Sequence, residues 1–340
     1  MNVIELHQAV WDRLQARRQR MPHALLITGQ RGLGKYALAK EFAAGLLCEN
    51  PAADGRACGC CLACNWFSQG NHPDFRLLQP EALAEAEGEG EEGKKKASQQ
   101  ITIEQVRSLD DFFNVGTHRS GLRIILVYPT EAMNRNTANA LLKSLEEPSP
   151  GTLFLLVSGE PMRLLPTIRS RCQVVPVPVP ATADAVAALK AVGVTEAEQW
   201  LALAGGAPLL AWELAQSGQG QWLDQLVKRL AAGGRGDALA AAAEIDKLLK
   251  DSKGRVGLRQ VVEWTQKWTV DLAMAAQSLP VRYFSGQRAT IEKLAGDTPV
   301  YKFLGFHRKL LRERRQVDQP LNARLFLETL FMDYRALFSK

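Results

Sequence analysis

A glycine-rich segment near the N-terminus has the residue types that bind phosphate. Gly29, Gly32 and Gly34 precede Lys35, in the spacing Gly-x4-Gly-Lys, after an apolar run at 24–28 and before a helical pattern. Glycines let backbone N–H groups turn toward phosphate oxygens, and the lysine reaches the β and γ phosphates. The spacing predicts a P-loop with ATP or ADP as candidate ligand, and the alternative is a chance glycine turn.

The residues that would hold Mg²⁺ beside this loop are replaced. Tyr36 stands where a P-loop carries a Ser or Thr that binds the metal. A second apolar run ends at Tyr128-Pro129, where an Asp and a Glu are expected. Glu131 could bind the metal only after a shift in register. A carboxylate at this position is more often a solvated residue at the start of a helix. Hydrolysis should therefore be negligible, while nucleotide binding stays open.

Five of the six cysteines are clustered. We assign Cys48, Cys58, Cys61 and Cys64 as ligands of one structural Zn²⁺ ion, with Cys60 as the spare thiol. Four soft ligands at short spacing suit a tetrahedral ion and leave no open position for catalysis. Unliganded buried thiols are the alternative, and a DNA-reading module is disfavoured because the cluster interrupts a strand–helix alternation.

An arginine-containing segment at 161–172 follows a strand-like run at 152–157. A guanidinium at such a turn suits phosphate, because its donors form a planar fork and it is always charged. From the spacing alone, a surface arginine or an internal salt bridge is more frequent.

Strand-like runs alternate with helical patterns up to about residue 178, which predicts an α/β domain with a mostly parallel sheet. Prolines at 176–180 indicate a connector, and the rest of the chain is helical in pattern. We expect domains at 1–178, 179–217 and 218–340, with the cysteine module at 48–64. Residues 81–100 are acidic, then basic, and poor in large apolar side chains, which predicts a mobile insertion.

Bulk properties exclude few functions. The net charge of +6 permits contact with nucleic acid without establishing it. The N-terminus lacks the pattern of a signal peptide, and the apolar runs are shorter than a membrane span. We therefore expect a cytoplasmic protein with no membrane partner, and a reducing compartment favours a metal site over disulfides.

Taken together, the motifs resemble those of the clamp-loader branch of the AAA+ proteins. The resemblance covers roughly residues 1 to 215 and is weaker in the helical tail. The matching elements are His23-Ala-Leu-Leu, the four cysteines, His72-Pro-Asp, Asn139-Ala-Leu-Leu-Lys-x-Leu-Glu-Glu-Pro, Ser170-Arg-Cys and, in the tail, Asn322-Ala-Arg-Leu-Phe-Leu-Glu.

The resemblance implies a P-loop domain of AAA+ type, a small helical lid and an all-helical collar. It also implies a place in a pentameric hetero-oligomer that loads a sliding clamp onto primer-template DNA, as part of a polymerase holoenzyme. Arg171 would act in trans on a neighbour's ATP, and Leu209 lies near where active members carry a sensing arginine. The alternatives are an ATP-binding or weakly active AAA+ ATPase and an autonomous DNA-binding protein.

Overall fold

The computed structural model describes residues 1–87, 97–114, 117, 121–252, 254–296, 298–314, 317 and 322–339. The contacts divide the chain into two compact units, residues 2–180 and residues 181–340. Each unit has its own core, and the boundary falls directly after the last proline of the 176–180 segment.

The first unit is built on a five-stranded parallel sheet in the order β2-β3-β4-β1-β5. The strands are β1 (Ala24–Thr28), β2 (Phe75–Leu78), β3 (Arg123–Val127), β4 (Thr152–Ser158) and β5 (Gln173–Pro176). All residues of β1, β3 and β4 are buried, as expected for central parallel strands covered on both faces. The predicted α/β class, the parallel sheet and the strand-like runs at 24–28 and 152–157 are confirmed.

Strand β5 was not predicted. It pairs with β1, with Thr28 opposite Pro176, and lies at the edge of the sheet. Proline lacks the N–H that a central strand requires, so a proline-rich segment favours a connector. An edge strand that ends at its proline avoids this conflict, which explains the difference.

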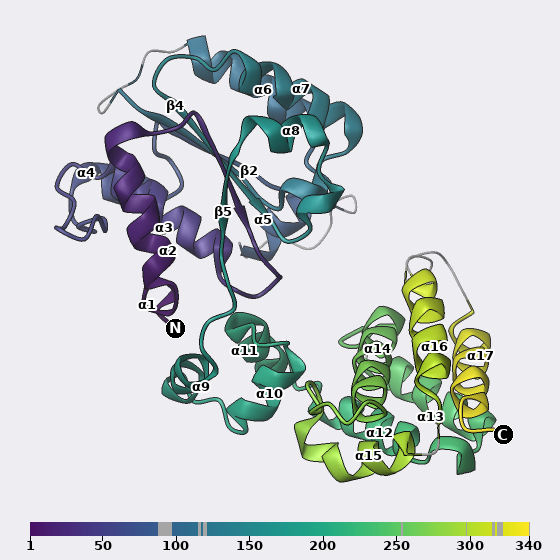
Figure 1. Ribbon diagram of the computed structural model, residues 1–340. Coiled ribbons are helices and arrows are strands. Elements are labelled where there is room, and N and C mark those ends of the chain that lie inside the picture. The colour runs from purple at the N-terminus through teal and green to yellow at the C-terminus, as the bar shows by residue number, and fades with distance from the viewer. Residues whose placement is uncertain are drawn as a thin grey trace. The chain divides into compact units, whose positions relative to one another are not determined.

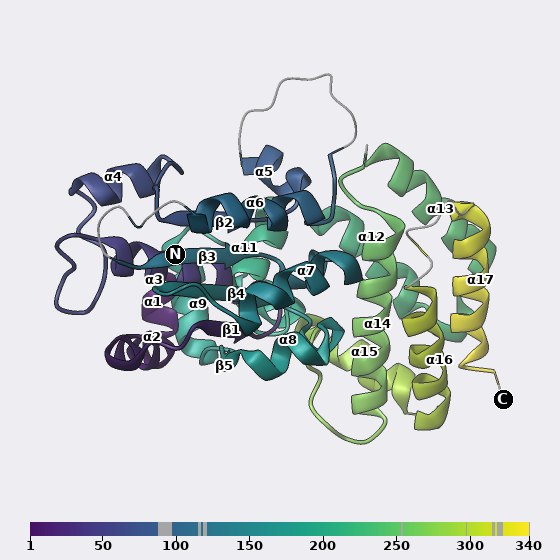
Figure 2. The same cartoon turned by 90° about the horizontal axis from the view of Figure 1, so that it is seen from above.

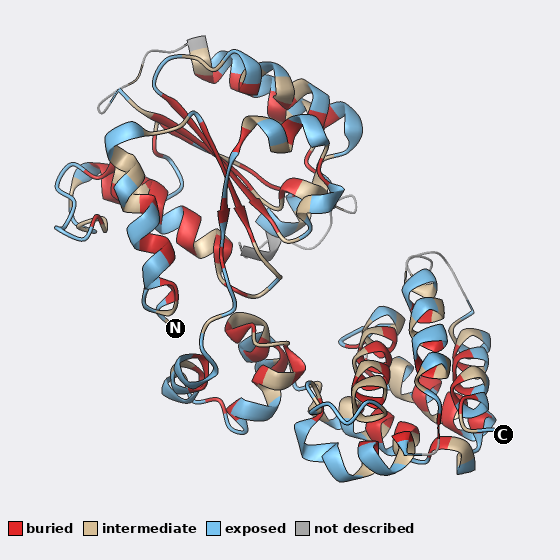
Figure 3. Cartoon of the chain, in the orientation of Figure 1, coloured by how far each residue is buried: buried red, intermediate tan, exposed pale blue. Residues whose placement is uncertain are grey.

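Helices cover both faces of this sheet, and the buried residues lie between the layers (Figure 1, Figure 3). The helices of this unit are α1 (Val3–Leu6), α2 (Gln8–Ala16), α3 (Lys35–Leu47), α4 (Leu62–Ser68), α5 (Glu81–Glu87), α6 (Ile103–Asn114), α7 (Arg135–Glu146) and α8 (Pro166–Arg171). Helices α2 and α3 lie on one side of the sheet, and α6 and α7 lie on the other (Figure 1).

Local sequence signals set the ends of two helices. Thr102 and Gln105 form a reciprocal capping box at the start of α6, with side chain to backbone distances of 2.9 and 3.3 Å. Asn134 caps α7 by accepting the N–H of Thr137 at 2.9 Å. Helix α7 begins at Arg135 and ends at Glu146, before Pro148, which cannot continue a helix.

The segment at 81–100 begins with a helix. The N–H of Ser98 donates to Glu81 Oε2 at 3.2 Å, and the N–H of Ala82 donates to the Ser98 carbonyl at 3.1 Å. These bonds tie the two ends of the segment together. Residues 88–96 lie outside the described residues, so the mobility expected there stays a prediction.

The second unit is helical throughout its described residues. Its helices are α9 (Thr182–Ala191), α10 (Ala197–Leu203), α11 (Pro208–Gln216), α12 (Gly220–Ala231), α13 (Ala238–Asp251), α14 (Leu258–Ala275), α15 (Arg288–Ala295), α16 (Val300–Glu313) and α17 (Ala323–Ala336). Helix α13 packs along α17, and α14 packs along α16 (Figure 2). Among the helices described, none has the length and apolar character to cross a lipid bilayer.

Candidate functional site

The glycine loop leaves the end of β1 and opens α3, as the spacing predicts. Gly32 and Gly34 have φ of +81° and +84°, in the left-handed region that favours glycine. A Cβ on Gly29 would lie 2.6 Å from the carbonyl oxygen of Val177. The loop therefore depends on glycine both for its turns and for its close contact with the segment that follows β5.

Lys35 is folded against its own loop. The ammonium donates to the Gln30 carbonyl oxygen at 2.7 Å, and the residue is 6% exposed. Burial lowers the pKa of Lys35 to about 8, partly opposed by attraction to the carboxylate of Glu131. The Gln30 carbonyl oxygen thus accepts a hydrogen bond from the Lys35 ammonium that a phosphate oxygen would otherwise accept.

Tyr36 and Tyr128, which stand at the two expected metal-ligand positions, are brought together by the fold. Their rings stack with centroids 4.6 Å apart and planes 22° apart. Tyr36 is in the first turn of α3, and Tyr128 directly follows β3. Two aromatic rings therefore meet where a hydrolysing P-loop protein gathers oxygen ligands for Mg²⁺.

Glu131 is not the solvated helix-start residue that the sequence favoured. One carboxylate oxygen accepts the N–H of Gly159 at 2.8 Å, and the other is buried without a hydrogen-bond partner. Gly159 directly follows β4, so the carboxylate is turned inward across the carboxyl ends of two strands. Local sequence could not indicate this contact, because Gly159 is distant along the chain.

His7 also supports the loop and was not identified from the sequence. Its Nε2 lies 2.7 Å from the Leu33 carbonyl oxygen, and the residue is 3% exposed. Since a carbonyl only accepts, Nε2 carries the proton. Burial lowers the pKa of His7, an effect that this hydrogen bond partly opposes.

The four predicted cysteine ligands converge. The sulfurs of Cys48, Cys58, Cys61 and Cys64 all lie within 4.8 Å of one another. The Cys48–Cys61 and Cys58–Cys64 sulfur distances are both 3.9 Å. Four sulfurs held about 2.3 Å from a tetrahedral ion lie roughly 3.8 Å apart. These cysteines can therefore hold a metal ion, and the two 3.9 Å distances are close to those around a tetrahedral Zn²⁺.

The loop between α3 and α4 supplies hydrogen bonds that favour thiolates. The Cys58 N–H donates to Cys48 Sγ at 3.2 Å, and the Cys61 N–H donates to Cys58 Sγ at 3.4 Å. Backbone N–H groups of Cys60 and Cys61 lower the pKa of the Cys58 thiol to about 6. Cys60 is exposed, with its sulfur 3.6 Å from Cys58 Sγ, outside the set of four.

Arg171 is the last residue of α8. Its guanidinium donates to the Thr167 carbonyl oxygen at 3.0 Å and pairs with Glu146 at the end of α7. The side chain is 34% exposed. An internal salt bridge and a partly exposed guanidinium, which the sequence presented as alternatives, are thus both present.

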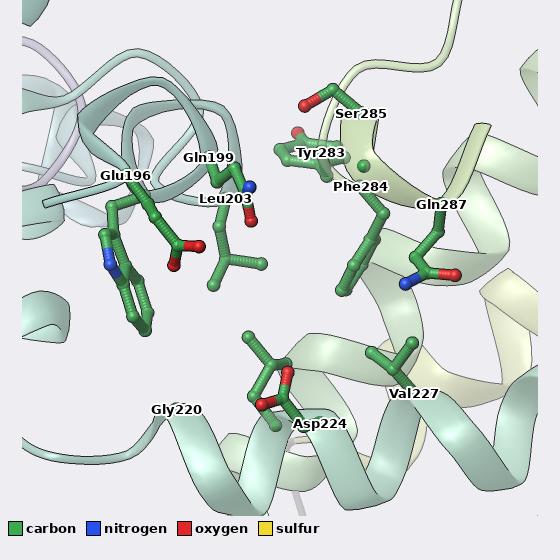
Figure 4. Close-up of a pocket in the computed structure, with 13 residues that line it drawn as sticks. Glu196, Gln199, Leu203, Gly220, Asp224, Val227, Tyr283, Phe284, Ser285 and Gln287 are labelled. Atoms are coloured by element: carbon green, nitrogen blue, oxygen red, sulfur yellow. The ribbon is translucent and has the colours of Figure 1, made fainter.

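A cavity of about 150 Å³ lies in the second unit, between α10, α12 and the segment at 283–287 (Figure 4). Asp224 and Glu196 border it, and Leu203, Val227 and Phe284 supply apolar walls (Figure 4). None of the predicted site residues lines this cavity.

The fold and the loop define the class of protein. A parallel sheet with β1 between β4 and β5, and a Gly-x4-Gly-Lys loop from β1 into α3, form a P-loop domain of AAA+ type, followed by helical regions. The family model described as DNA polymerase III, delta subunit, matches residues 7–180. This chain belongs to the DNA polymerase III delta-prime family.

Curated relatives agree. The DNA polymerase III subunit delta' of Pseudomonas aeruginosa is 37% identical, with 97% of this chain and 96% of the relative covered. The Haemophilus influenzae subunit delta' is 35% identical over 58% of this chain and 56% of its own. A solved gamma-subunit-related protein of Thermotoga maritima is 19% identical with a TM-score of 0.44, covering 97% and 99% of the two chains. The relationship to the two delta' subunits supports a clamp-loader role.

Proposed function

We propose that this chain is a non-hydrolysing subunit of the bacterial DNA polymerase III clamp loader that lends Arg171 to a neighbour's ATP. It works in a pentameric hetero-oligomer in the cytoplasm and meets the sliding clamp and primer-template DNA through that assembly. Residues 179–217 serve as the helical lid and 218–340 as the collar. The observation that carries the proposal is the stack of Tyr36 on Tyr128.

The absence of hydrolysis follows from how Mg²⁺ is used. Phosphoryl transfer depends on a metal that neutralises charge on the β and γ phosphates, and that metal needs oxygen ligands close to the backbone. A phenol ring is longer than a serine side chain, and here two such rings pack on each other. A phosphate would also have to displace the hydrogen bond from Lys35 to the Gln30 carbonyl oxygen. Binding of ATP or ADP without hydrolysis stays compatible with the glycines.

A weakly active ATPase is the second candidate, because Glu131 turns inward near Lys35. One oxygen of this carboxylate is committed to the N–H of Gly159. Hydrolysis through the remaining oxygen would still lack the Ser or Thr hydroxyl that Tyr36 replaces.

The guanidinium of Arg171 suits action across an interface. It is partly exposed, at the end of a short helix, and its counter-ion Glu146 is itself partly exposed. Exchanging this surface ion pair, which is worth little, for a triphosphate gains charge-assisted hydrogen bonds. In related enzymes an arginine finger supplies roughly 10³ to 10⁵ in rate.

The metal in this proposal is a structural Zn²⁺ ion. Cys48 ends α3, Cys61 caps α4 and Cys64 lies within α4, so one ion would join both helices through their connecting loop. Four thiolates fill a tetrahedral ion, which leaves no position for substrate. The ion would stabilise the fold of residues 48–64 and supply no chemistry.

The test is steady-state ATP hydrolysis by the clamp loader reassembled from purified subunits. Arg171→Ala should lower the rate at least about tenfold, because one developing charge loses its partner. Arg169→Ala, two residues away in the same helix, is the matched control and should retain the rate. The isolated chain should not hydrolyse ATP at its own loop, so Lys35→Ala should leave its background rate of ATP hydrolysis unchanged. Unchanged turnover in Arg171→Ala contradicts the proposed role of this arginine, and Lys35-dependent turnover by the chain alone favours the weak ATPase.

A further inference from the structure

A large open groove lies beside the stacked tyrosines, outside the glycine loop. It has a volume of about 790 Å³ and is bordered by α3, by the end of α4 with the turn after it, and by β2. Strand β2 is at the edge of the sheet, so no further strand covers its outer side. A volume of this size suits an extended or drug-sized ligand and far exceeds the roughly 30 Å³ of a water molecule.

The charged side chains that border the groove are both basic. Lys40 is exposed, with its ammonium 5.9 Å from the centroid of the Tyr36 ring. Arg76 is exposed on β2. No Asp or Glu is among the described residues that line the groove. The groove is therefore suited to an anion.

Arg76 is held in place before any ligand arrives. Its guanidinium donates to the Phe75 carbonyl oxygen at 2.8 Å and lies 4.5 Å from the centroid of the Phe112 ring. Stacking on an aromatic face and bonding to the backbone restrict the rotamers of a long side chain. A ligand that contacts this guanidinium consequently loses less conformational entropy than one that orders a free arginine.

The opposite wall supplies neutral hydrogen-bonding groups. Ser68, Gln69 and Asn71 are exposed and border the groove at the end of α4. Gln69 Nε2 donates to Asn65 Oδ1 at 3.3 Å, and Ser68 Oγ donates to the Asn65 carbonyl oxygen at 2.9 Å. Hydroxyl and amide side chains, together with Lys and Arg, are among the groups that hydrogen-bond nucleic-acid backbones. This wall begins in the helix that Cys61 caps, so the cysteine module would position it.

We propose that this groove binds the phosphodiester backbone of single-stranded nucleic acid. Such a strand carries a charge at every nucleotide, which suits a groove whose charged lining residues are both basic. Two cations, neutral donors and the Tyr36 ring match the grooves that follow such strands without reading their sequence. An acidic peptide would use the cations but has less use for the aromatic ring and the amide donors.

The test uses the full isolated chain, so its outcome is separate from ATP hydrolysis in the assembly. Binding of a fluorescently labelled thymidine oligonucleotide of about 20 nucleotides is followed by anisotropy at several salt concentrations. The variant Lys40→Gln/Arg76→Gln should bind about tenfold more weakly at low salt. Its slope of log K against log salt should be shallower by about 1.4, since each neutralised phosphate contributes about 0.7.

The matched control is Lys228→Gln/Arg308→Gln, which removes the same charge from exposed positions of the second unit. It should retain the wild-type affinity and slope. Lys40→Gln alone should make the slope shallower by about 0.7. Because Lys40 is exposed, this single variant tests the proposal even if Arg76→Gln disturbs folding. Equal losses in the groove and control variants, or no binding at low salt, overturn the proposal. Tighter, Lys40-dependent binding of a polyglutamate peptide of equal length also overturns it, in favour of an acidic protein partner.

Discussion

Two tyrosines occupy the positions where a hydrolysing P-loop protein holds its metal ion. Each tyrosine replaces one residue that would supply an oxygen ligand. The fold also stacks Tyr36 on Tyr128, so each ring stabilises the position of the other. Aromatic pairs of this kind contribute about 0.5–1.5 kcal/mol beyond the area they bury. Restoring one ligand alone would therefore also break a packing contact.

At the residue scale, the zinc proposal separates two adjacent cysteines. Purified Cys60→Ser should contain one zinc per chain and melt like the wild type, because Cys60 lies outside the converging set. Cys58→Ser should lose zinc and destabilise the first unit, since three thiolates hold the ion poorly. Metal analysis together with thermal melting measures both effects. Zinc-free wild-type protein, or equal behaviour of the two variants, contradicts the assignment.

The buried imidazole of His7 gives a prediction for pH. Its folded pKa lies below the unfolded value of about 6.5. Near pH 6.5 the unfolded chain therefore binds more protons at this site than the folded chain does, so acidification through this region lowers stability. The burial-lowered pKa of His307 acts in the same direction.

In His7→Gln, the loss of stability between about pH 7.5 and 5.5 should become smaller, because one of these two linked groups is gone. Chemical denaturation of the full chain at both pH values measures the difference. An unchanged pH dependence in His7→Gln would show that His7 titrates alike in the folded and unfolded chains.

At the scale of elements, apolar runs in the sequence identified the central strands of the sheet. Continuous apolar runs are typical of parallel strands buried on both faces, so β1, β3 and β4 were predictable. Strand β5 was not, because its pairing with β1 outweighs the local preference of a proline-rich segment. The local sequence indicates which conformation a segment prefers in isolation. Pairing at the edge of a sheet depends also on the strand beside it.

The candidate site shows the same division. Spacing alone located the glycine loop and the four cysteines, because both depend on residues close in sequence. The contacts of Tyr36 with Tyr128, of Glu131 with Gly159 and of Arg171 with Glu146 join different elements. They arise from strand order and helix packing, which no local pattern encodes. The pairing of Lys35 with Gln30 depends on the turn that the loop adopts.

One buried hydroxyl, that of Tyr334, joins helix α17 to helices α12 and α14 through hydrogen bonds. Tyr334 donates to the Leu230 carbonyl oxygen at 2.7 Å and accepts the indole N–H of Trp268 at 2.9 Å. Tyr334→Phe should lower the free energy of unfolding by about 1–3 kcal/mol, because it leaves buried partners unsatisfied. Tyr301→Phe, at a position 67% exposed, should change it by less than about 0.5 kcal/mol. Denaturant unfolding of both variants tests this, and equal values would mean that the buried bonds contribute nothing net.

At the scale of the whole molecule, the chain combines a P-loop domain, in which Tyr36 and Tyr128 stand at the expected Mg²⁺-ligand positions, with a helical second unit. In the account proposed here, the first unit contributes a guanidinium and a folded scaffold, and neighbouring subunits bind and hydrolyse ATP. The groove beside Tyr36 would give that scaffold a further contact with nucleic acid. These roles require no turnover by the chain itself.

The most direct measurement is a structure of the reassembled clamp loader with a non-hydrolysable ATP analogue and Mg²⁺. We predict that Arg171 has left Glu146 and lies within hydrogen-bond distance, about 3 Å, of the neighbouring subunit's terminal phosphate. We also expect no coordinated Mg²⁺ beside Tyr36. Arg171 facing solvent, or a triphosphate with a fully coordinated Mg²⁺ in the loop at Gly29–Lys35, would contradict it.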